Sequence, residues 1–195
     1  HYKKIMSLIT PKTALVSLSD KSNLNELIKF LLDQEVKIIS TGGTYNAIKK
    51  ITDMVIEVSE FTGFEEMMNG RVKTLHPKIH AGILARRETD LEVLTERGYE
   101  VIDMVIVNLY PFQETVASDC KFDEAIEKID IGGPTMIRSA AKNFKDVVVI
   151  SDPNDYGQLI HEWKNQGGIS YEFRKELSQK VFQLMAEYNS AIANY

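Results

Sequence analysis

Residues 14–39 read ALVSLSDKSNLNELIKFLLDQEVKII, and this stretch indicates the fold class. Its first five residues, 14–18, form a short, mostly apolar run that predicts a strand. Apolar residues then recur at helical spacing, and Ser22 or Asn23 is placed to cap that helix. Residues 36–39 predict a second strand. A strand, a helix and a strand in this order are typical of a parallel β-sheet.

The same alternation continues through the rest of the chain. Further strands are predicted at residues 55–58, 101–109 and 147–150, with helical segments between several of them. We therefore predict an α/β fold with a mostly parallel, doubly wound sheet flanked by helices. Toward the C-terminus, residues 154–163 have a helical pattern, and an apolar stripe over residues 173–192 predicts a longer helix that packs in the core or at an interface.

The length of the chain agrees with one domain and some additions. Its 195 residues are about 1.3 times the roughly 150 residues expected of a domain. We expect residues 1–12 to be an N-terminal extension or residues added for expression. Residues 13–152 are expected to form the core, and residues 153–195 a C-terminal helical extension.

The composition excludes several classes of protein. With 44% hydrophobic and 26% charged residues, the chain is neither disordered nor collagen-like. Its apolar runs are far shorter than the roughly 20 residues of a membrane-spanning helix, and no signal-peptide pattern opens the sequence. The single cysteine, Cys120, cannot form an internal disulfide, which favours a reducing, cytoplasmic location.

A net charge of −5 conceals one basic stretch, residues 71–87, which holds five basic and no acidic residues and leaves −10 for the rest of the chain. A basic patch on an acidic protein suits a small anionic ligand better than a nucleic acid, although a solvated basic loop is the alternative. His76 and His80 are four residues apart, but Pro77 argues against one helix that carries both, and no motif indicates a metal. The basic residues are Arg71, Lys73, Lys78, Arg86 and Arg87.

Polar residues follow the first two predicted strands. Ligands of open α/β sheets bind outside the carboxyl ends of the strands, so these residues are candidates for a site. Residues 17–21 contribute hydroxyls, a carboxylate and an ammonium, and residues 40–44, STGGT, open a predicted helix whose amides can bind phosphate. Helix capping and a structural turn are the respective alternatives. The glycines match neither the dinucleotide-binding pattern nor the P-loop pattern.

The strand predicted at residues 101–109 also ends in polar residues. A period of two puts Asn108 and Tyr110 on one side of this strand. The alternative is a structural tyrosine, since a buried tyrosine beside a proline, here Pro111, commonly has that role.

Another polar cluster opens a helix farther along the chain. Asp130 is followed by two glycines and by Pro134, and proline suits the first turn of a helix. In that helix Arg138 and Lys142 are four residues apart, so a bound anion would relieve their repulsion. Exposed to water, the same pair would lower the stability of the helix by only roughly a few tenths of a kcal/mol. A solvent-exposed pair without a ligand is therefore the alternative.

Together these residues resemble the IMP cyclohydrolase domain of the bifunctional AICAR transformylase/IMP cyclohydrolase family of purine biosynthesis. The resemblance covers residues 13–195, and its strength lies in the order and spacing of the motifs. The motifs are SDK at 19–21, STGGT at 40–44, GRVKTLHP at 70–77, NLYPF at 108–112, and DIGG at 130–133 with Lys142-Asn143. The family fold is similar to that of methylglyoxal synthase, and its members are typically homodimers.

The resemblance implies an IMP cyclohydrolase, which closes 5-formamido-AICAR ribotide to IMP with loss of water. The exocyclic amine attacks the formyl carbon, and the hydroxyl then leaves. The implied ligand is a purine ribonucleotide, with no metal, no cofactor, no nucleic acid and no membrane. A larger formyltransferase domain follows in the family, so residues 153–195 are expected to lead toward a domain absent here, and transformylase activity is not expected of this chain.

The resemblance also implies roles for particular residues. Lys142 corresponds to the proton donor and acceptor, and Tyr110 and Asp130 lie near the reacting groups. Lys73 binds or polarises the reacting end. The residues implied to hold the 5′-phosphate are Ser19, Asp20, Lys21, Thr41, Gly42, Gly43 and Thr44. Those implied to line the ribose or base region are Arg71, Val72, Thr74, Asn108 and Ile131.

Two other functions fit a fold of this kind. A regulatory nucleotide-binding module, similar to that of carbamoyl-phosphate synthetase, needs the phosphate loop but not the combination of Tyr110, Asp130 and Lys142. Methylglyoxal synthase is expected to use carboxylates and to eliminate phosphate from dihydroxyacetone phosphate. Product analysis with each substrate distinguishes the three functions.

Overall fold

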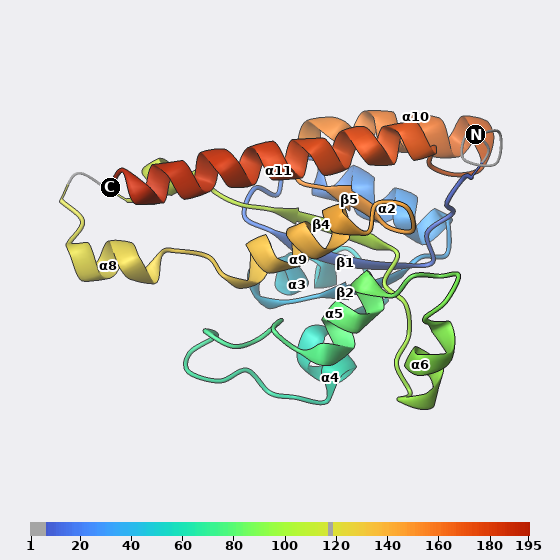
Figure 1. The fold of residues 1–195 in the computed structure, drawn as a ribbon, viewed down its shortest axis with the longest axis horizontal. Coiled ribbons are helices and arrows are strands. Elements are labelled where there is room, and N and C mark those ends of the chain that lie inside the picture. The colour runs from blue at the N-terminus through green and yellow to red at the C-terminus, as the bar shows by residue number, and fades with distance from the viewer. Residues whose placement is uncertain (1–6, 117–118) are drawn as a thin grey trace.

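The computed structural model describes residues 7–116 and 119–195, and a five-stranded parallel sheet lies at its centre (Figure 1). The strand order is β3-β2-β1-β4-β5, and every pair of neighbours is parallel. This arrangement confirms the predicted fold class. The strands are β1 (Thr13–Leu18), β2 (Lys37–Ser40), β3 (Val55–Glu57), β4 (Met104–Asn108) and β5 (Val148–Ile150).

Helices connect the strands and cover the sheet. The long helix α11 runs across the molecule and packs against α9 and β5 (Figure 1). None of the described helices is both long and apolar enough to cross a membrane. The helices are α2 (Leu24–Asp33), α3 (Gly42–Lys49), α4 (Val58–Thr62), α5 (Pro77–Leu84), α6 (Leu91–Glu96), α7 (Phe112–Thr115), α8 (Phe122–Glu127), α9 (Gly132–Lys142), the 3-10 helix η1 (Pro153–Asp155), α10 (Tyr156–Gln166) and α11 (Tyr171–Ala193).

The two central strands, β1 and β4, are almost continuous apolar runs. Leu15, Val16 and Val105 are completely removed from solvent. Because helices cover both faces of a parallel sheet, side chains on either side of its central strands are buried. An apolar run without alternation therefore predicted these strands correctly.

The strand predicted at residues 101–109 is shorter in the structure and begins at Met104. The preceding residue, Asp103, uses its carboxylate to accept hydrogen bonds from the backbone N–H groups of Lys12 and Thr13. These bonds hold the start of β1 beside the start of β4. Burial raises the pKa of Asp103, and the same backbone bonds oppose that rise.

Three smaller differences concern helix boundaries. Val58 begins α4 and does not end a strand. Asn23, and not Ser22, occupies the cap position of α2, and its side chain makes no bond to the helix. The helix predicted at residues 154–163 consists of η1 followed by α10, because Asp152 caps a 3-10 turn first.

Arg174, a completely buried residue, joins α11 to the segments that precede β1 and β5. Its guanidinium donates hydrogen bonds to backbone carbonyls, those of Ser7, Phe144, Lys145 and Ile169. Ser178 donates a further bond of 2.7 Å to the carbonyl of Ala141 in α9. The segment after β5 is therefore packed on the sheet and on α9.

The parallel register brings the carboxyl ends of the strands to one edge of the sheet. Leu18, the last residue of β1, pairs with Asn108, the last residue of β4. Val16 pairs with Ser40, the last residue of β2. The polar residues that follow these strands consequently share one edge, which we call the carboxyl edge, and the opposite edge is the amino edge.

Candidate functional site

A cavity of about 190 Å³ lies at the carboxyl edge. It is built from the ends of β1 and β4, the residue before α3, the loop that precedes α5 and the start of α9. The predicted site residues among its lining are Ser19, Thr41, Arg71, Lys73, Thr74, Asn108 and Asp130. The sequence motifs that follow separate strands therefore do meet in space.

Two further cavities adjoin this central one because they share lining residues with it. A cavity of about 390 Å³ shares Arg71 and Asp130 and extends along the end of α8 to Ile131. A cavity of about 240 Å³ shares Thr41 and Lys73 and extends to the start of α4. The carboxyl edge thus offers an elongated depression with room on both sides of the central cavity.

The glycines of the STGGT motif form the N-terminus of α3. Gly42 has φ +57°, a left-handed conformation that favours glycine. Two ammonium groups flank the pair: a Cβ atom on Gly42 would lie 3.6 Å from Lys73 Nζ, and one on Gly43 would lie 3.9 Å from Lys21 Nζ. Unpaired amides and the helix dipole make this end of a helix positive, and the two lysines add to that potential.

Thr41, the residue that precedes α3, has a buried hydroxyl with no hydrogen-bond partner among the described residues. Only 8% of the residue is exposed, and its side chain makes no capping bond to the helix. An unpaired buried hydroxyl costs about 1–3 kcal/mol of stability. The group is therefore placed to bond with a molecule that enters the cavity.

The hydroxyl of Thr44, by contrast, is not open to a ligand, although this residue was expected to hold phosphate. Its hydroxyl accepts a hydrogen bond of 2.8 Å from the N–H of Leu18 and lies 3.2 Å from the carbonyl of the same residue, to which it donates. Thr44 is almost completely buried. Its hydroxyl joins α3 to the end of β1, and the predicted contact of Thr44 with phosphate stays a prediction.

Asn108 lines the cavity, but its side-chain amide is bonded to the loop after β1. The amide oxygen accepts from the N–H groups of Ser19 (2.7 Å) and Asp20 (2.9 Å), and the amide nitrogen donates to the carbonyl of Asp20 (2.8 Å). Asn108 shapes this loop, which is a different task from the predicted substrate contact. The Asp20 carboxylate turns to Ser22, whose hydrogen bonds lower the pKa of Asp20.

The loop before α5 supplies the cationic side of the depression. Lys73 Nζ lies 2.9 Å from a carboxylate oxygen of Glu66, and Arg71 lies 3.3 Å from Glu127. Val72 pairs with the backbone of Met67 in an isolated bridge and does not line the cavity, contrary to expectation. The bridge closes a turn that presents its two neighbours to the cavity.

Asp130 lies where α9 begins, and the helix is packed closely around it. The N–H of Gly133 donates a 3.2 Å bond to Asp130 Oδ1. A Cβ atom on Gly133 would lie 2.5 Å from Asp130 Oδ2, and one on Gly132 would lie 2.6 Å from the Thr74 hydroxyl. Burial raises the pKa of Asp130, while hydrogen bonds from backbone N–H groups oppose the rise. A carboxylate of this kind is suited to proton transfer.

Tyr188 contacts the same loop and was not predicted as a site residue. Its hydroxyl accepts a 2.9 Å hydrogen bond from the backbone N–H of Asp130, 58 residues away in the sequence. The sequence identified Tyr188 only as one member of the apolar stripe of a long helix. Nothing in that stripe distinguishes a tyrosine that packs from a tyrosine that also bonds.

Tyr110 does not line the cavity that contains Lys73. Because β4 ends at Asn108, the alternation of side chains along the strand does not extend to Tyr110. Its side chain is 52% exposed and lines a separate, mostly apolar cavity of about 170 Å³ between the end of β4 and α11. Tyr188 lines this second cavity as well. Tyr110 is therefore near the Asp130 loop but on its other side.

Lys142 is not brought to the site within one chain. It is the last residue of α9, and Gly132 is the first. Ten residue steps of about 1.5 Å separate the two ends by about 15 Å. Lys142 is exposed, and Arg138, one turn before it, lies 5.8 Å from the ring centre of Phe182. Within the single chain, Lys142 is not grouped with Asp130, and its predicted role in proton transfer stays a prediction.

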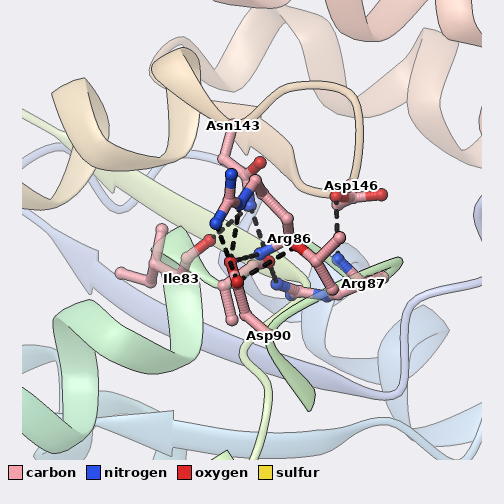
Figure 2. A network of polar contacts seen from close by, with 8 residues as sticks. Ile83, Arg86, Arg87, Asp90, Asn143 and Asp146 are labelled. Carbon is pink, nitrogen blue, oxygen red and sulfur yellow. Dashed lines mark hydrogen bonds and ion pairs between the residues drawn. The ribbon is translucent and has the colours of Figure 1, made fainter. Parts of the chain in front are cut away.

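The basic stretch does not form one patch. Lys78 lies 4.5 Å from the ring centre of Phe61. Arg86 is paired with Asp90, whose pKa its hydrogen bonds lower strongly, and the backbone N–H of Arg87 donates to Asp146 at the amino edge (Figure 2). Arg71 and Lys73 therefore remain as the two members that line the central cavity. As expected, no helix carries both histidines: His76 caps α5, and His80 lies inside it.

Comparisons with known proteins agree with this architecture. Residues 23–135 match the family described as MGS-like domain, and residues 140–195 match the family described as AICARFT/IMPCHase bienzyme. Proteins named bifunctional purine biosynthesis protein PurH are 53% identical in Clostridium botulinum (strain Loch Maree / Type A3) and 54% identical in Clostridium perfringens (strain 13 / Type A). The matches cover 94% of this chain and 37% of either relative.

A solved structure, described as the crystal structure of ForH, has the same fold. It superposes with a TM-score of 0.81 at 34% sequence identity, over 94% of this chain and 98% of that chain. The family match spans more than half of the sequence and includes the loop with Lys73, the end of β4 and the start of α9. The chain therefore belongs to the MGS-like domain family, and within it is similar to the bifunctional purine biosynthesis proteins.

Proposed function

We propose that the chain acts in purine biosynthesis as an IMP cyclohydrolase, which closes 5-formamido-AICAR ribotide to IMP with loss of water. The observation that carries the proposal is the N-terminus of α3, where the unpaired hydroxyl of Thr41 lies beside two lysines. A ribotide has a phosphate dianion that fits this positive end. The names of the relatives and of the second matching family support the same pathway.

The depression has the length to hold the rest of a ribotide. With the phosphate at the start of α3, the ribose and base extend through the central cavity toward Asp130. The larger cavity beyond, with Arg71 and Ile131, then accommodates the reacting end of the base. This placement puts Lys73 at the phosphate end of the bound molecule, because its ammonium lies beside Gly42, and puts Asp130 near the base.

The chemistry requires orientation, charge stabilisation and proton transfer. Nucleophile and electrophile belong to one substrate, so a binding site that holds them in contact removes most of the entropic barrier. Lys73, whose ammonium lies beside Gly42 at the start of α3, binds the phosphate in this placement. Arg71, which lines both the central and the larger cavity, stabilises the negative charge that develops on the formyl oxygen. Asp130 accepts the proton of the attacking nitrogen, and its raised pKa makes it a better base than an ordinary aspartate. The same groups serve the departure of water.

The proposal includes a homodimer, which also accounts for Lys142. The resemblance assigns proton transfer to this lysine, yet Lys142 is the last residue of α9, about 15 Å along the helix from Gly132 beside Asp130, and does not line its own cavity. Lys142 therefore acts in the cavity of a second copy of the chain. Two-fold symmetric dimers place equivalent residues reciprocally, so each copy would supply one lysine to the other.

Product formation tests the proposal. The isolated chain, incubated with the formylated ribotide and without folate or metal, is expected to form IMP, which chromatography separates from the substrate. Folded protein that forms no IMP would contradict the proposal. Dihydroxyacetone phosphate serves as the control substrate, and the expected result is no methylglyoxal. Formation of methylglyoxal would favour the phosphate-eliminating alternative.

A further inference from the structure

Tyr188 links the longest helix of the protein to the site. It lies near the C-terminal end of α11, is 6% exposed, and accepts the hydrogen bond from the backbone N–H of Asp130 at 2.9 Å. The ring is held in the core by its neighbours in the apolar stripe of α11. A fixed hydroxyl on a rigid helix is a firmer anchor than a residue of the loop itself.

The other bonds of Asp130 come from its own vicinity. Its carboxylate accepts from the N–H of Gly133, three residues later. Side chains confine it further, because Oδ2 lies in the space that a Cβ atom on Gly133 would enter, together with Leu109 Cδ2. Among the described residues, the bond to Tyr188 is the hydrogen bond that ties the Asp130 backbone to a distant element.

We propose that Tyr188 is a positioning residue for Asp130, which it holds at the depth in the cavity where the carboxylate takes up a proton. This inference rests on the proposed function, because it concerns the base of that reaction. The hydroxyl of Tyr188 does not line the central cavity and contacts no reacting atom. It acts through the loop alone.

Loss of the hydroxyl leaves the N–H of Asp130 without its partner. The loop then opens to water to satisfy that group. Asp130 already has exposed surface, but desolvation of its carboxyl group raises its pKa. Additional water around the carboxylate stabilises its ionised form, so the pKa of Asp130 falls toward that of an ordinary aspartate. Other charged or titratable groups that line the cavities around Asp130 are Arg71, Lys73, Glu127 and Lys128, and the change leaves all of them in place.

The chain offers a matched control in Tyr156 of α10. This tyrosine is also buried, with 3% exposed, but its hydroxyl has no hydrogen-bond partner among the described residues. Tyr188→Phe and Tyr156→Phe therefore make the same chemical change in two buried rings. Only Tyr188→Phe removes a hydrogen bond to the backbone of Asp130.

The test compares these two variants by steady-state kinetics over a range of pH and by an NMR titration of the Asp130 carboxyl carbon. In Tyr188→Phe, kcat is expected to fall about tenfold, the effect of one misplaced hydrogen-bonded group. KM should change less than twofold. Because Asp130 must be ionised to act, the acid limb of the kcat profile should move to lower pH, and so should the NMR titration. Tyr156→Phe should match the wild type.

The NMR titration tests the positioning role of Tyr188, and product formation tests the proposed function. An unchanged Asp130 titration in folded Tyr188→Phe would overturn the positioning role, whatever the activity. Equal shifts in both variants would overturn it too, because they would show a general effect of removing a buried hydroxyl. Wild-type protein that forms no IMP would instead contradict the proposed function, and the NMR titration would still report whether Tyr188 sets the environment of Asp130.

Discussion

The amino edge and the carboxyl edge of the sheet treat buried polar side chains differently. At the amino edge, Asn143 donates to the carbonyls of Ile83 and Ala85, and Arg87 donates to the carbonyls of Ala85 and Ile102 (Figure 2). At the carboxyl edge, the buried side chains of Thr44 and Asn108 are likewise bonded to the backbone, but the hydroxyl of Thr41 is buried without a partner among the described residues.

The contrast separates structural polar groups from binding groups. Buried polar groups that bond to the backbone contribute to folding, and removing one leaves its partners unsatisfied. A buried group that the protein leaves unsatisfied lowers stability until a ligand bonds to it. We therefore expect substitutions at the amino edge to reduce stability and substitutions at the carboxyl edge to reduce binding or turnover.

The largest expected effect is that of Lys73→Ala. Without the ammonium, the phosphate at the start of α3 loses a cationic partner, and kcat/KM for IMP formation should fall about 10²–10³-fold. Lys78→Ala, in the same basic stretch but directed at the ring of Phe61, is the control and should retain activity within about threefold. Equal losses in both would show that the general positive charge matters and that the position of Lys73 does not.

Lys142→Ala tests whether an amino-edge residue can also serve the reaction. Turnover should fall about 10²-fold, as expected for a lost proton-transfer group. Mixed with Lys73→Ala under conditions that exchange subunits, it should recover about a quarter of wild-type activity, since half of the sites in each mixed dimer keep both lysines. Full activity of Lys142→Ala alone, or no recovery in the mixture, would contradict the shared site.

Alanine substitutions of two buried asparagines, one at each edge of the sheet, test the comparison of the edges. Asn143→Ala removes the donor to the carbonyl of Ile83 and one of the two donors to the carbonyl of Ala85, and should lower the free energy of unfolding by about 1–3 kcal/mol. Its KM should not change. Asn108→Ala should lower stability similarly and also raise KM, because the loop with Ser19 loses its support. Urea denaturation and steady-state kinetics measure both effects, and identical KM values in the two variants would remove the distinction.

The fold was predictable because its signals are local. Each central strand is an apolar run buried on both faces, and the parallel order follows from strands that alternate with helices. The same topology explains why Ser19, Thr41 and Asp130 could be predicted to share a site. Each follows a strand or begins a helix at the edge where ligands of such sheets bind.

The remainder of the site depends on where each helix carries a residue and on which group each side chain bonds to. Tertiary packing decides both, and a local sequence pattern does not reveal them. The basic stretch is continuous in sequence, but α5 lies between Lys73 and Arg86 and carries the latter to the opposite edge. A similar helix length separates Lys142 from Asp130. Thr44 and Asn108 were placed correctly at the carboxyl edge, yet which group each side chain bonds to follows from packing. The bond to Tyr188 spans 58 residues and left no local signal.

The central claim is that the open groups of the carboxyl edge bind a ribonucleotide phosphate, and Thr41→Val tests it most directly. Valine keeps the shape of the side chain and removes the unpaired hydroxyl. Calorimetric titration with IMP should show binding weakened about tenfold, while the free energy of unfolding stays equal or rises by up to about 1 kcal/mol. Unchanged affinity for IMP, or a loss of stability, would contradict the claim and make the hydroxyl a structural group.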